Sequence, residues 1–531
     1  MRAAQAKAAP SPAKGIAEAF AHYQNGRLAD AETICAAILA AEPEHFDTLH
    51  LLGLLRHQQG RNAEALRLVG AVLRRAPRSA EVLSNYGLIL ASLARHEEAL
   101  ACFEDALANC VDHLCALKNR AALLKRLARN EQALAAYEAV LATKHDDVEA
   151  LNECGGLHVR LGRPNAAVAC YDKALAVAPR VAELHINKGS ALVALNRFDQ
   201  AMESFAAAVA IEPDQAEAHY KASLIHLRRG DFKSGWRDYE WRWRTERAPA
   251  RQDTAAPLWL GEQPIRGKTI LLLAEQGFGD TLNFVRYAPL VAALGATVIL
   301  AVPSPLKTIA ATIPGVAQVL EEGETAPNVD FYCPLLSLPL ALGTELATVP
   351  ANIPYLRPCE ERLTKWCEKL PQNGRLRVGL CWAGSNVHLN DHNRSIPLER
   401  FAKILSVQNL DFISVQKEVS EPQAALLRQH HVVQLGQEFN DFADTAAVLA
   451  RLDLLISVDT SVAHVAGAMG KAVALLVPFA PDWRWLLDRT DSPWYPTMRL
   501  FRQSAIGDWG GPLERLRQEL TAVAERPVKP N

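Results

Sequence analysis

The feature that most constrains the fold of this chain is a spacing of 34 residues that recurs through its first half. A small residue keeps this spacing at Ala31, Ala65, Ala99, Ala133, Ala167 and Ala201. Glycine keeps it at Gly53, Gly87, Gly155 and Gly189, and proline closes four repeats at Pro43, Pro77, Pro179 and Pro213. Because proline lacks an N–H group and ends helices, the period predicts pairs of helices that stack into an array.

These positions resemble the tetratricopeptide repeat, a helix–turn–helix unit in which small residues lie where the two helices touch. We count six repeats from near Lys14 and a shortened seventh. The sequence therefore predicts a disordered tail over residues 1–13 and an all-α tetratricopeptide solenoid over residues 14–247. Most side chains of such an array pack against neighbouring repeats, and its concave groove suits a peptide or protein partner. The alternative is a spacer or an oligomerisation arm.

Two groups of side chains stand out within the array. Asparagines occupy nearly equivalent positions on the first helices of four repeats, at Asn85, Asn119, Asn152 and Asn187. Their amides can bind a peptide backbone, and helix capping or exposure to solvent is the alternative. Large aromatic residues crowd the incomplete last repeat, at Trp236, Tyr239, Trp241 and Trp243. A free surface does not suit so many aromatics, so we expect this end of the array to pack against the second half of the chain.

Composition excludes several classes of protein. The formal net charge of −2 does not favour binding to nucleic acid or to a membrane surface, and no apolar run is long enough to span a bilayer. The N-terminus lacks the apolar segment of a signal peptide. The 10 cysteines are scattered without a CxxC pair, which is the pattern of reduced thiols. We therefore expect a cytoplasmic protein.

The second half alternates short apolar runs with helical stretches, after a linker over residues 248–266 that is rich in Pro, Gln and charged residues. The expected strands are Thr269–Ala274, Thr297–Val302, Val329–Tyr332, Arg377–Trp382, Asp411–Val415, Leu454–Val458 and Ala472–Val477. Such alternation predicts parallel sheets. We expect two Rossmann-like α/β domains, over residues 267–358 and 359–531, with a ligand cleft between their carboxyl edges.

One strand–loop–helix stretch, over residues 452–470, has the features of an anion site. Asp459, Thr460 and Ser461 are good capping residues that directly follow an expected strand, and Val462–Met469 predicts a tightly packed helix. The free N–H groups and the positive dipole end of that helix would point to the carboxyl edge of the sheet, where phosphate binds well. An ordinary strand–cap–helix unit without a ligand is the alternative.

The first strand of the second half runs into the loop Gly277-Phe278-Gly279-Asp280. A lone GxG after a strand is weak evidence for a dinucleotide site, and the third glycine is missing, so we expect no nicotinamide or flavin cofactor. This loop and Asp459–His464 resemble the two signature segments of glycosyltransferase family 9, which contains the heptosyltransferases. The whole chain resembles bacterial proteins that fuse tetratricopeptide repeats to such a domain, including soluble flagellin glycosyltransferases. It is also similar in plan to protein O-GlcNAc transferases.

This resemblance implies the GT-B architecture, in which two Rossmann-like domains face each other, and inverting transfer of a sugar from a nucleotide diphosphate. It implies that Asp280 is the general base, because attack at an anomeric carbon needs a carboxylate that takes the proton of the acceptor. Gly277 and Gly279 would let the acceptor approach the backbone closely. Asp280 can also serve as the N-cap of the following helix, and the two roles are compatible.

The donor diphosphate needs hydrogen-bond donors aimed at the charge that develops on it. Some of these donors are predicted to be the backbone N–H groups of Thr460, Ser461 and Val462, which lie beside Asp459 in the predicted donor site. The predicted donor-binding cations are Arg394 and Lys417, with surface salt bridges as the alternative.

Three more residues complete the predicted donor site. His464 faces the same helix end and is predicted to contact the donor sugar or phosphate, with a buried structural histidine as the alternative. Asp482 and Trp483 follow the last expected strand, where they can accept a ribose hydroxyl and stack on a base, or form a packed lid. The chain contains no Asp-x-Asp pair, so we expect no metal and no other cofactor.

These inferences predict an inverting, metal-independent glycosyltransferase that holds a protein acceptor on its repeats and transfers a sugar to a Ser or Thr hydroxyl. The first α/β layer, about Gly267–Pro358, is shorter than the acceptor domain of the heptosyltransferases, and the repeat array is the obvious replacement. One alternative is a saccharide acceptor in envelope assembly. Another is a repeat scaffold whose α/β half has lost activity and binds a nucleotide or nothing.

Overall fold

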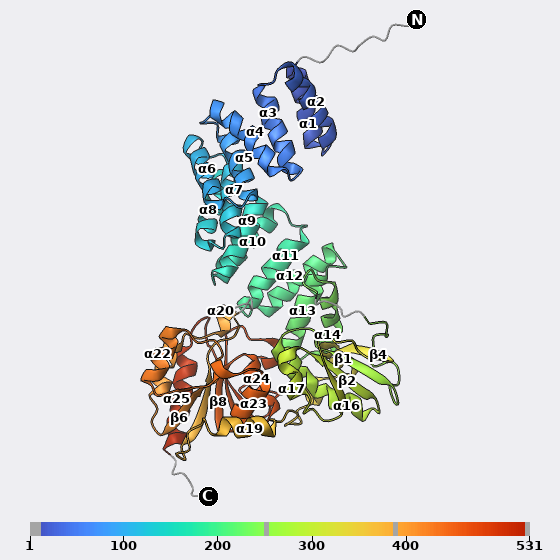
Figure 1. Cartoon of the computed structure of the whole chain (residues 1–531), viewed down its shortest axis with the longest axis vertical. Coiled ribbons are helices and arrows are strands. Elements are labelled where there is room, and N and C mark those ends of the chain that lie inside the picture. Colours follow the sequence, from blue (N-terminus) through green and yellow to red (C-terminus); the bar gives the residue numbers. More distant parts are fainter. Residues whose placement is uncertain (1–11, 249–253, 386–390, 526–531) are drawn as a thin grey trace. The chain divides into compact units, whose positions relative to one another are not determined.

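The structure, a computed structural model, describes residues 12–248, 254–385 and 391–525. The chain forms two compact units, which divide between Leu195 and Asn196 (Figure 1). In its described part the first unit is all helical, whereas the second begins with three helices of the repeat array and continues into two parallel sheets. Stacked helical pairs followed by a Rossmann-like α/β region are the fold class that the sequence predicts. The predicted tail lies outside the described residues up to residue 11, and the predicted domain boundaries stay predictions.

The described part of the first unit consists of helices, the first ten of which pack in successive pairs. They are α1 (Pro12–Gln24), α2 (Leu28–Ala41), α3 (Phe46–Gln58), α4 (Asn62–Arg75), α5 (Ala80–Ser92), α6 (His96–Asn109), α7 (Leu114–Arg126), α8 (Asn130–Thr143), α9 (Val148–Arg160), α10 (Pro164–Val177) and α11 (Ala182–Ala194). Glycine permits the close approach within a pair, because a Cβ atom on Gly87 would lie 2.7 Å from Phe103 and one on Gly155 2.5 Å from Tyr171. The 34-residue spacing therefore reflects contacts between paired helices.

The four asparagines of the array link neighbouring repeats. Their hydrogen-bond partners are His50 for Asn85, Ser84 for Asn119, Glu183 for Asn152, and Asn152 for Asn187. A repeat-to-repeat ladder of this kind fixes the stacking of the first helices. Binding of a peptide backbone by the same amides stays a prediction.

The second unit opens with α12 (Phe198–Ile211), α13 (Ala216–Arg228), the short α14 (Phe232–Tyr239) and the 3₁₀ turn η1 (Glu240–Arg244). Trp236 of α14 is 2% exposed, and its ring lies edge-on to Trp483 at a centroid distance of 5.2 Å. Phe284 and Trp494 flank the same ring at 6.0 and 6.5 Å. The prediction that the aromatic end of the array packs against the α/β half is therefore confirmed.

Two all-parallel sheets follow. The first has the order β3-β2-β1-β4, formed by β1 (Thr269–Leu273), β2 (Thr297–Val302), β3 (Val316–Glu321) and β4 (Phe331–Pro334). The second has the order β10-β9-β8-β5-β6-β7, formed by β5 (Leu376–Cys381), β6 (Leu410–Ser414), β7 (Val433–Gln434), β8 (Leu454–Val458), β9 (Val473–Val477) and β10 (Met498–Arg502). Strands β1 and β8 are internal to their sheets, which explains their continuous apolar sequences.

The sequence did not predict β3, β7 and β10. Strand β3 is an edge strand whose middle residues Ala317 and Gln318 are exposed, and β7 is only two residues long. Strand β10 lies at the other edge of its sheet and includes the exposed Arg499. Edge strands with polar residues lack the apolar run that identifies a buried strand.

Helices and 3₁₀ turns cover both sheets (Figure 1). They are α15 (Phe278–Phe284), η2 (Val285–Tyr287), α16 (Ala288–Ala293), η3 (Ser304–Leu306), α17 (Lys307–Ala310), η4 (Leu335–Ser337), α18 (Leu338–Ala341), η5 (Leu346–Thr348), α19 (Glu360–Cys367), α20 (Asp391–Arg394), η6 (Leu398–Phe401), α21 (Ala402–Leu405), α22 (Glu421–Gln429), η7 (Gly436–Glu438), α23 (Phe442–Ala450), α24 (Ser461–Ala468), η8 (Trp483–Trp485) and α25 (Gly510–Ala524). Residues 278–293 form three short helical pieces and not one long helix, because Pro289 cannot donate a helical hydrogen bond. Part of the predicted linker is packed, since Trp259 is 2% exposed and its backbone N–H donates to Tyr332 O at 2.8 Å.

We predict that Trp236→Ala lowers the free energy of unfolding of the second unit by about 3–5 kcal/mol, because it removes the ring against which the other aromatics pack. Trp241→Ala is the matched control, since Trp241 is half-buried and stacks on His219 at 4.2 Å. Thermal melts followed by circular dichroism measure both variants. Equal shifts in melting temperature would show that Trp236 does not anchor the array.

Candidate functional site

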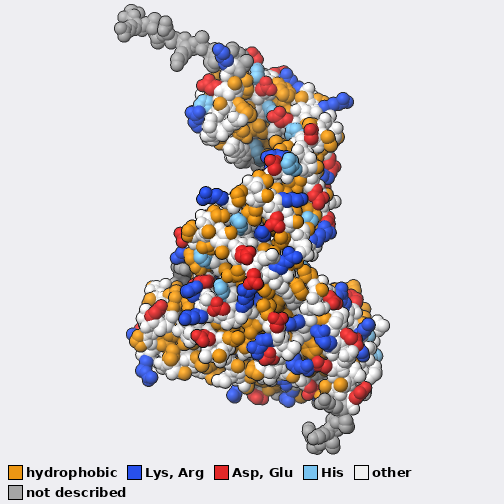
Figure 2. Space-filling view, turned by 180° about the vertical axis from the view of Figure 1, so that it is seen from behind, with side chains coloured by type: hydrophobic (Ala, Val, Ile, Leu, Met, Phe, Trp, Pro, Cys, Tyr) orange, Lys and Arg blue, Asp and Glu red, His pale blue; other side chains and the backbone are white. Residues whose placement is uncertain are grey.

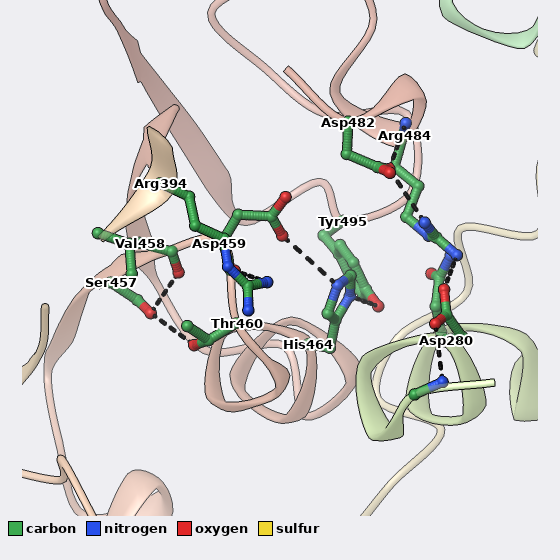
Figure 3. Close-up of polar contacts among 12 residues, drawn as sticks. Asp280, Arg394, Ser457, Val458, Asp459, Thr460, His464, Asp482, Arg484 and Tyr495 are labelled. Atoms are coloured by element: carbon green, nitrogen blue, oxygen red, sulfur yellow. Dashed lines mark hydrogen bonds and ion pairs between the residues drawn. The ribbon is translucent and has the colours of Figure 1, made fainter. Parts of the chain in front are cut away.

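The predicted catalytic loop lies where β1 ends and α15 begins. Asp280 is in the first turn of α15, and its Oδ2 accepts a hydrogen bond from the Gly277 N–H at 3.1 Å. The N-cap of α15 is therefore Gly277 and not Asp280 as predicted; Asp280 lies two residues inside the helix and caps its start by accepting the N–H of the N-cap residue. Its Oδ1 lies outside the helix and accepts a hydrogen bond from Arg484, a residue of η8 beyond β9 of the second sheet (Figure 3). Asp280 thus links the first sheet layer to the second.

Arg484 is the central cation of this site, and the sequence patterns did not single it out. It is 6% exposed, and it forms ion pairs with Asp280 and with Asp482, the latter at 3.0 Å. Its guanidinium lies over the ring of Trp483 at 4.3 Å. Burial opposes its charge, but the carboxylates of Asp482 and Asp280 outweigh this and raise the pKa of Arg484. The guanidinium is therefore a permanent charge between two acidic side chains.

His464 of α24 faces the glycine loop. A Cβ atom on Gly279 would lie 2.9 Å from His464 Cδ2, so only glycine allows α15 and α24 to approach this closely. His464 Nδ1 hydrogen-bonds the hydroxyl of Tyr495 at 2.9 Å, and its ring stacks on Trp485. Burial, followed by the positive charge of Arg484, lowers the pKa of His464 well below its usual value. A neutral imidazole therefore separates Asp280 from the end of β8.

The loop after β8 carries the other predicted donor-binding residues. Thr460 is buried and is the N-cap of α24, while Ser461 and Val462 are half-buried in its first turn. The first N–H groups of a helix have no intrahelical acceptor, so this end of α24 offers donors and a positive dipole. Arg394 reaches the same loop, because its Nη1 donates to Asp459 O at 2.9 Å (Figure 3).

Asp459 is the acidic group with the most perturbed ionisation at this site. Burial, followed by the negative charge of Asp482, raises the pKa of Asp459 to about 6. Its Oδ1 lies 3.9 Å from His464 Nε2. Asp459 therefore holds its proton to a higher pH than an ordinary aspartate does.

The remaining predicted residues are less closely grouped. Lys417 is exposed beyond the end of β6, and the side chain of Asp482 is 35% exposed. Trp483 is 3% exposed and packs among aromatic side chains, so in this structure it serves the core. Stacking of Trp483 on a base stays a prediction. A cavity of about 700 Å³ lies elsewhere, lined by residues of η3, α17 and β3 together with Asn440 and Asp441.

The last repeat also contributes to this region. Arg228 of α13 is buried, and its Nη2 donates to Pro481 O at 2.7 Å. Asn196 donates to Phe479 O at 2.7 Å. These two bonds hold the loop between β9 and η8, which carries Arg484. No local sequence signal identifies them, because each depends on a contact across more than 250 residues.

The chain carries tetratricopeptide repeats in its first half and a Rossmann-like α/β region in its second half. A profile described as "Tetratricopeptide repeat" matches residues 16–70, 50–110, 119–182, 155–215 and 186–235. One curated relative is Protein FlbA of Caulobacter vibrioides, which is 26% identical over 330 residues. This match covers 57% of the present chain and 55% of the relative, so the chain spans about half the length of that protein.

Solved structures match the repeat array. One is described as "Functional Characterization of Pseudomonas Aeruginosa pilF"; it is 18% identical, covers 39% of this chain and 94% of that one, and has a TM-score of 0.35. Another is described as a thermophilic TPR protein in Thermus thermophilus; it is 23% identical, covers 34% of this chain and 100% of that one, and has a TM-score of 0.30.

Two further observations concern membrane-spanning helices and the distribution of charge on the surface. Among the described residues no helix has the length and apolar character that a membrane span requires. Figure 2 shows basic and acidic side chains intermixed over the face that it presents, in keeping with a formal net charge of −2.

We predict that Gly279→Ala separates α15 from α24, because the buried ring of His464 cannot yield to a Cβ atom at 2.9 Å. The expected loss is about 1–3 kcal/mol of unfolding free energy, measured by denaturation. Gly277→Ala is the matched control, since its Cβ atom would meet only Asp280 Oδ2, at 3.3 Å. If the two variants lose the same stability, the close contact with His464 does not matter.

We predict that Asp459→Asn stabilises the protein relative to the wild type as the pH rises. The folded-state pKa of about 6 lies above that of an unfolded Asp, so the folded wild type binds more protons between about pH 4 and 6 and loses stability across this window. Asn does not titrate, and the variant should gain up to about 3 kcal/mol over the wild type by pH 7. Melting temperatures at both ends of the window measure this, and a difference independent of pH would contradict it.

Proposed function

We propose that this chain is an inverting glycosyltransferase of the GT-B type that uses a nucleotide-diphosphate sugar and needs no metal. The observation that carries the proposal is the placement of a carboxylate, Asp280, at the carboxyl end of β1, with His464 and the free end of α24 beyond it. Inverting transfer needs a proton acceptor on one side of the anomeric carbon and a positive, donor-rich site for the leaving group on the other.

In the proposed reaction, the hydroxyl of the acceptor loses its proton to a carboxylate oxygen of Asp280. The oxygen attacks C1 of the donor sugar, and the bond between C1 and the diphosphate oxygen breaks with its electron pair on the diphosphate. The N-terminus of α24 and Arg394 stabilise that charge, because backbone N–H groups and a guanidinium are fixed before the reaction. Lys417 is the second proposed cation, reaching the donor from the end of β6.

The proposed acceptor is a Ser or Thr hydroxyl of a protein held on the repeats. This is supported by the direct packing of the last repeat on the α/β region. Burial raises the pKa of Tyr220 of α13, and the charge of Asp280 adds to this increase, so the last repeat lies near the proposed base. Tyr239 reaches the same loop and accepts a hydrogen bond from Gln276 Nε2 at 3.2 Å. A polypeptide bound at this last repeat would therefore lie near Asp280.

The test combines a donor screen with one exchange in the loop. The wild type is incubated with a panel of nucleotide-diphosphate sugars, and the nucleoside diphosphate released by slow transfer to water is measured. Asp280→Asn should lower this rate about a hundredfold or more, because general-base catalysis contributes this much. The matched control is Asp491→Asn, an exchange of an exposed carboxylate that pairs with Arg489.

Co-expression with candidate acceptor proteins completes the test. An intact-mass increase with the wild type, lost with Asp280→Asn, supports protein glycosylation. Transfer only to free saccharides supports the envelope-assembly alternative. A protein that binds no nucleoside diphosphate, or an Asp280→Asn variant with full activity, would contradict the proposal; the first result would favour the scaffold alternative.

A further inference from the structure

Arg484 is arranged in a way that its structural role does not explain. Nη2 donates to Asp280 Oδ1, and Nη1 donates to Asp482 Oδ1 at 3.0 Å (Figure 3). The Nε–H group is buried and has no hydrogen-bond partner among the described residues. A buried donor without an acceptor is costly, and the cost is larger for a charged group. Arg484 therefore has unused capacity for an anionic acceptor.

Asp280, by contrast, already accepts a hydrogen bond at each carboxylate oxygen, and one of these bonds comes from the charged Arg484. Oδ2 accepts the Gly277 N–H at 3.1 Å, the bond by which Asp280 caps the start of α15 from its third position, and Oδ1 accepts from Arg484. A carboxylate takes a proton through a free lone pair that is directed at the proton donor. The oxygen that can become free without unwinding the start of α15 is Oδ1. Asp280 therefore accepts a proton more readily when Arg484 binds another anion in place of Asp280.

We propose that Arg484 binds the diphosphate of the nucleotide sugar and thereby releases Asp280 Oδ1 to act as the base; this inference rests on the proposed function. The Asp280–Arg484 pair joins the base to the loop that follows β9 of the second sheet. A diphosphate that enters between them competes with Asp280 for the guanidinium, because Arg binds phosphate oxygens as well as carboxylate oxygens. Binding of the donor would then free Asp280 from its ion pair with Arg484. Without the donor, Asp280 stays paired with Arg484.

This competition makes a prediction that a purely structural Arg484 does not make. If Asp280 and the diphosphate compete for one guanidinium, removal of the carboxylate charge should tighten nucleotide binding. Asp280→Asn should therefore lower the Kd of a nucleoside diphosphate by about three- to tenfold. An ordinary catalytic base that never touches the donor would leave this Kd unchanged.

The experiment is a double-mutant cycle on the full chain, with Kd measured by calorimetry. The proteins are the wild type, Asp280→Asn, Arg484→Gln and the double variant, and the ligands are UDP, GDP, ADP, CDP and dTDP with their nucleosides. Arg484→Gln should raise the Kd of the diphosphate that binds the wild type by about 10- to 100-fold, as expected for charge-assisted hydrogen bonds, and leave that of the nucleoside unchanged. In the Arg484→Gln background, Asp280→Asn should have no effect on Kd.

The matched control pair is Arg489→Gln and Asp491→Asn, a solvent-accessible ion pair in the same part of the chain. Neither exchange should change any Kd. Arg484→Lys is the second variant if Arg484→Gln does not fold, and it should retain more diphosphate affinity than Gln because it keeps the charge. Asp280→Asn is nearly isosteric and decides the question without any change at Arg484.

Two results would overturn the inference while leaving the proposed function intact. One is transferase activity in the wild type with a nucleoside-diphosphate Kd that Asp280→Asn does not change. The other is an equal loss of nucleoside and diphosphate affinity in Arg484→Gln, which would make Arg484 only a positioning residue for the loop. A wild type that binds no nucleoside diphosphate would reject the proposed function and this inference together.

Discussion

Buried guanidinium groups fix the geometry on which the candidate site depends. Arg242, at the end of the repeats, pairs with Glu275 at 3.0 Å, and both are almost fully buried. Arg286, after α15, donates to Trp494 O at 2.6 Å and to Tyr355 OH at 3.0 Å. A buried charge is tolerated only where hydrogen bonds satisfy it, so these contacts hold the last repeat and the two sheet layers in one arrangement. Arg484 is another buried guanidinium, and its acidic partners are Asp280, the proposed base, and Asp482.

Sequence patterns predict those parts of the fold that depend on residues close together in the chain. The 34-residue spacing predicted the helix pairs, and the strands at Thr297–Val302 and Leu454–Val458 were predicted to the residue. Strands β3, β7 and β10 were missed because they are short or lie at sheet edges with polar residues, where the apolar run is absent. Burial of Trp236 was predicted from the number of aromatics near it, although its partners Trp483 and Trp494 were not.

The candidate site was less predictable than the fold. Asp280, His464 and Thr460 were recognised because each lies in a segment that follows a strand and that resembles a known signature. Arg484 was not recognised, although it follows Asp482 and Trp483 closely, because nothing local distinguishes a buried arginine from an exposed one. Its role comes from contact with Asp280, 204 positions away. The close approach of Gly279 to His464 was likewise not predicted, because it too is a contact between residues far apart in the sequence.

Hydrogen exchange of backbone amides, with and without a nucleoside diphosphate, tests the proposed donor site most directly. One ligand is proposed to lie against both the start of α24 and the loop after β9. Exchange should therefore slow at Thr460–His464 and at Asp482–Trp485 together. Protection confined to the cavity residues Ser304–Thr308 and Asn440–Asp441, with no change at the start of α24, would contradict that placement.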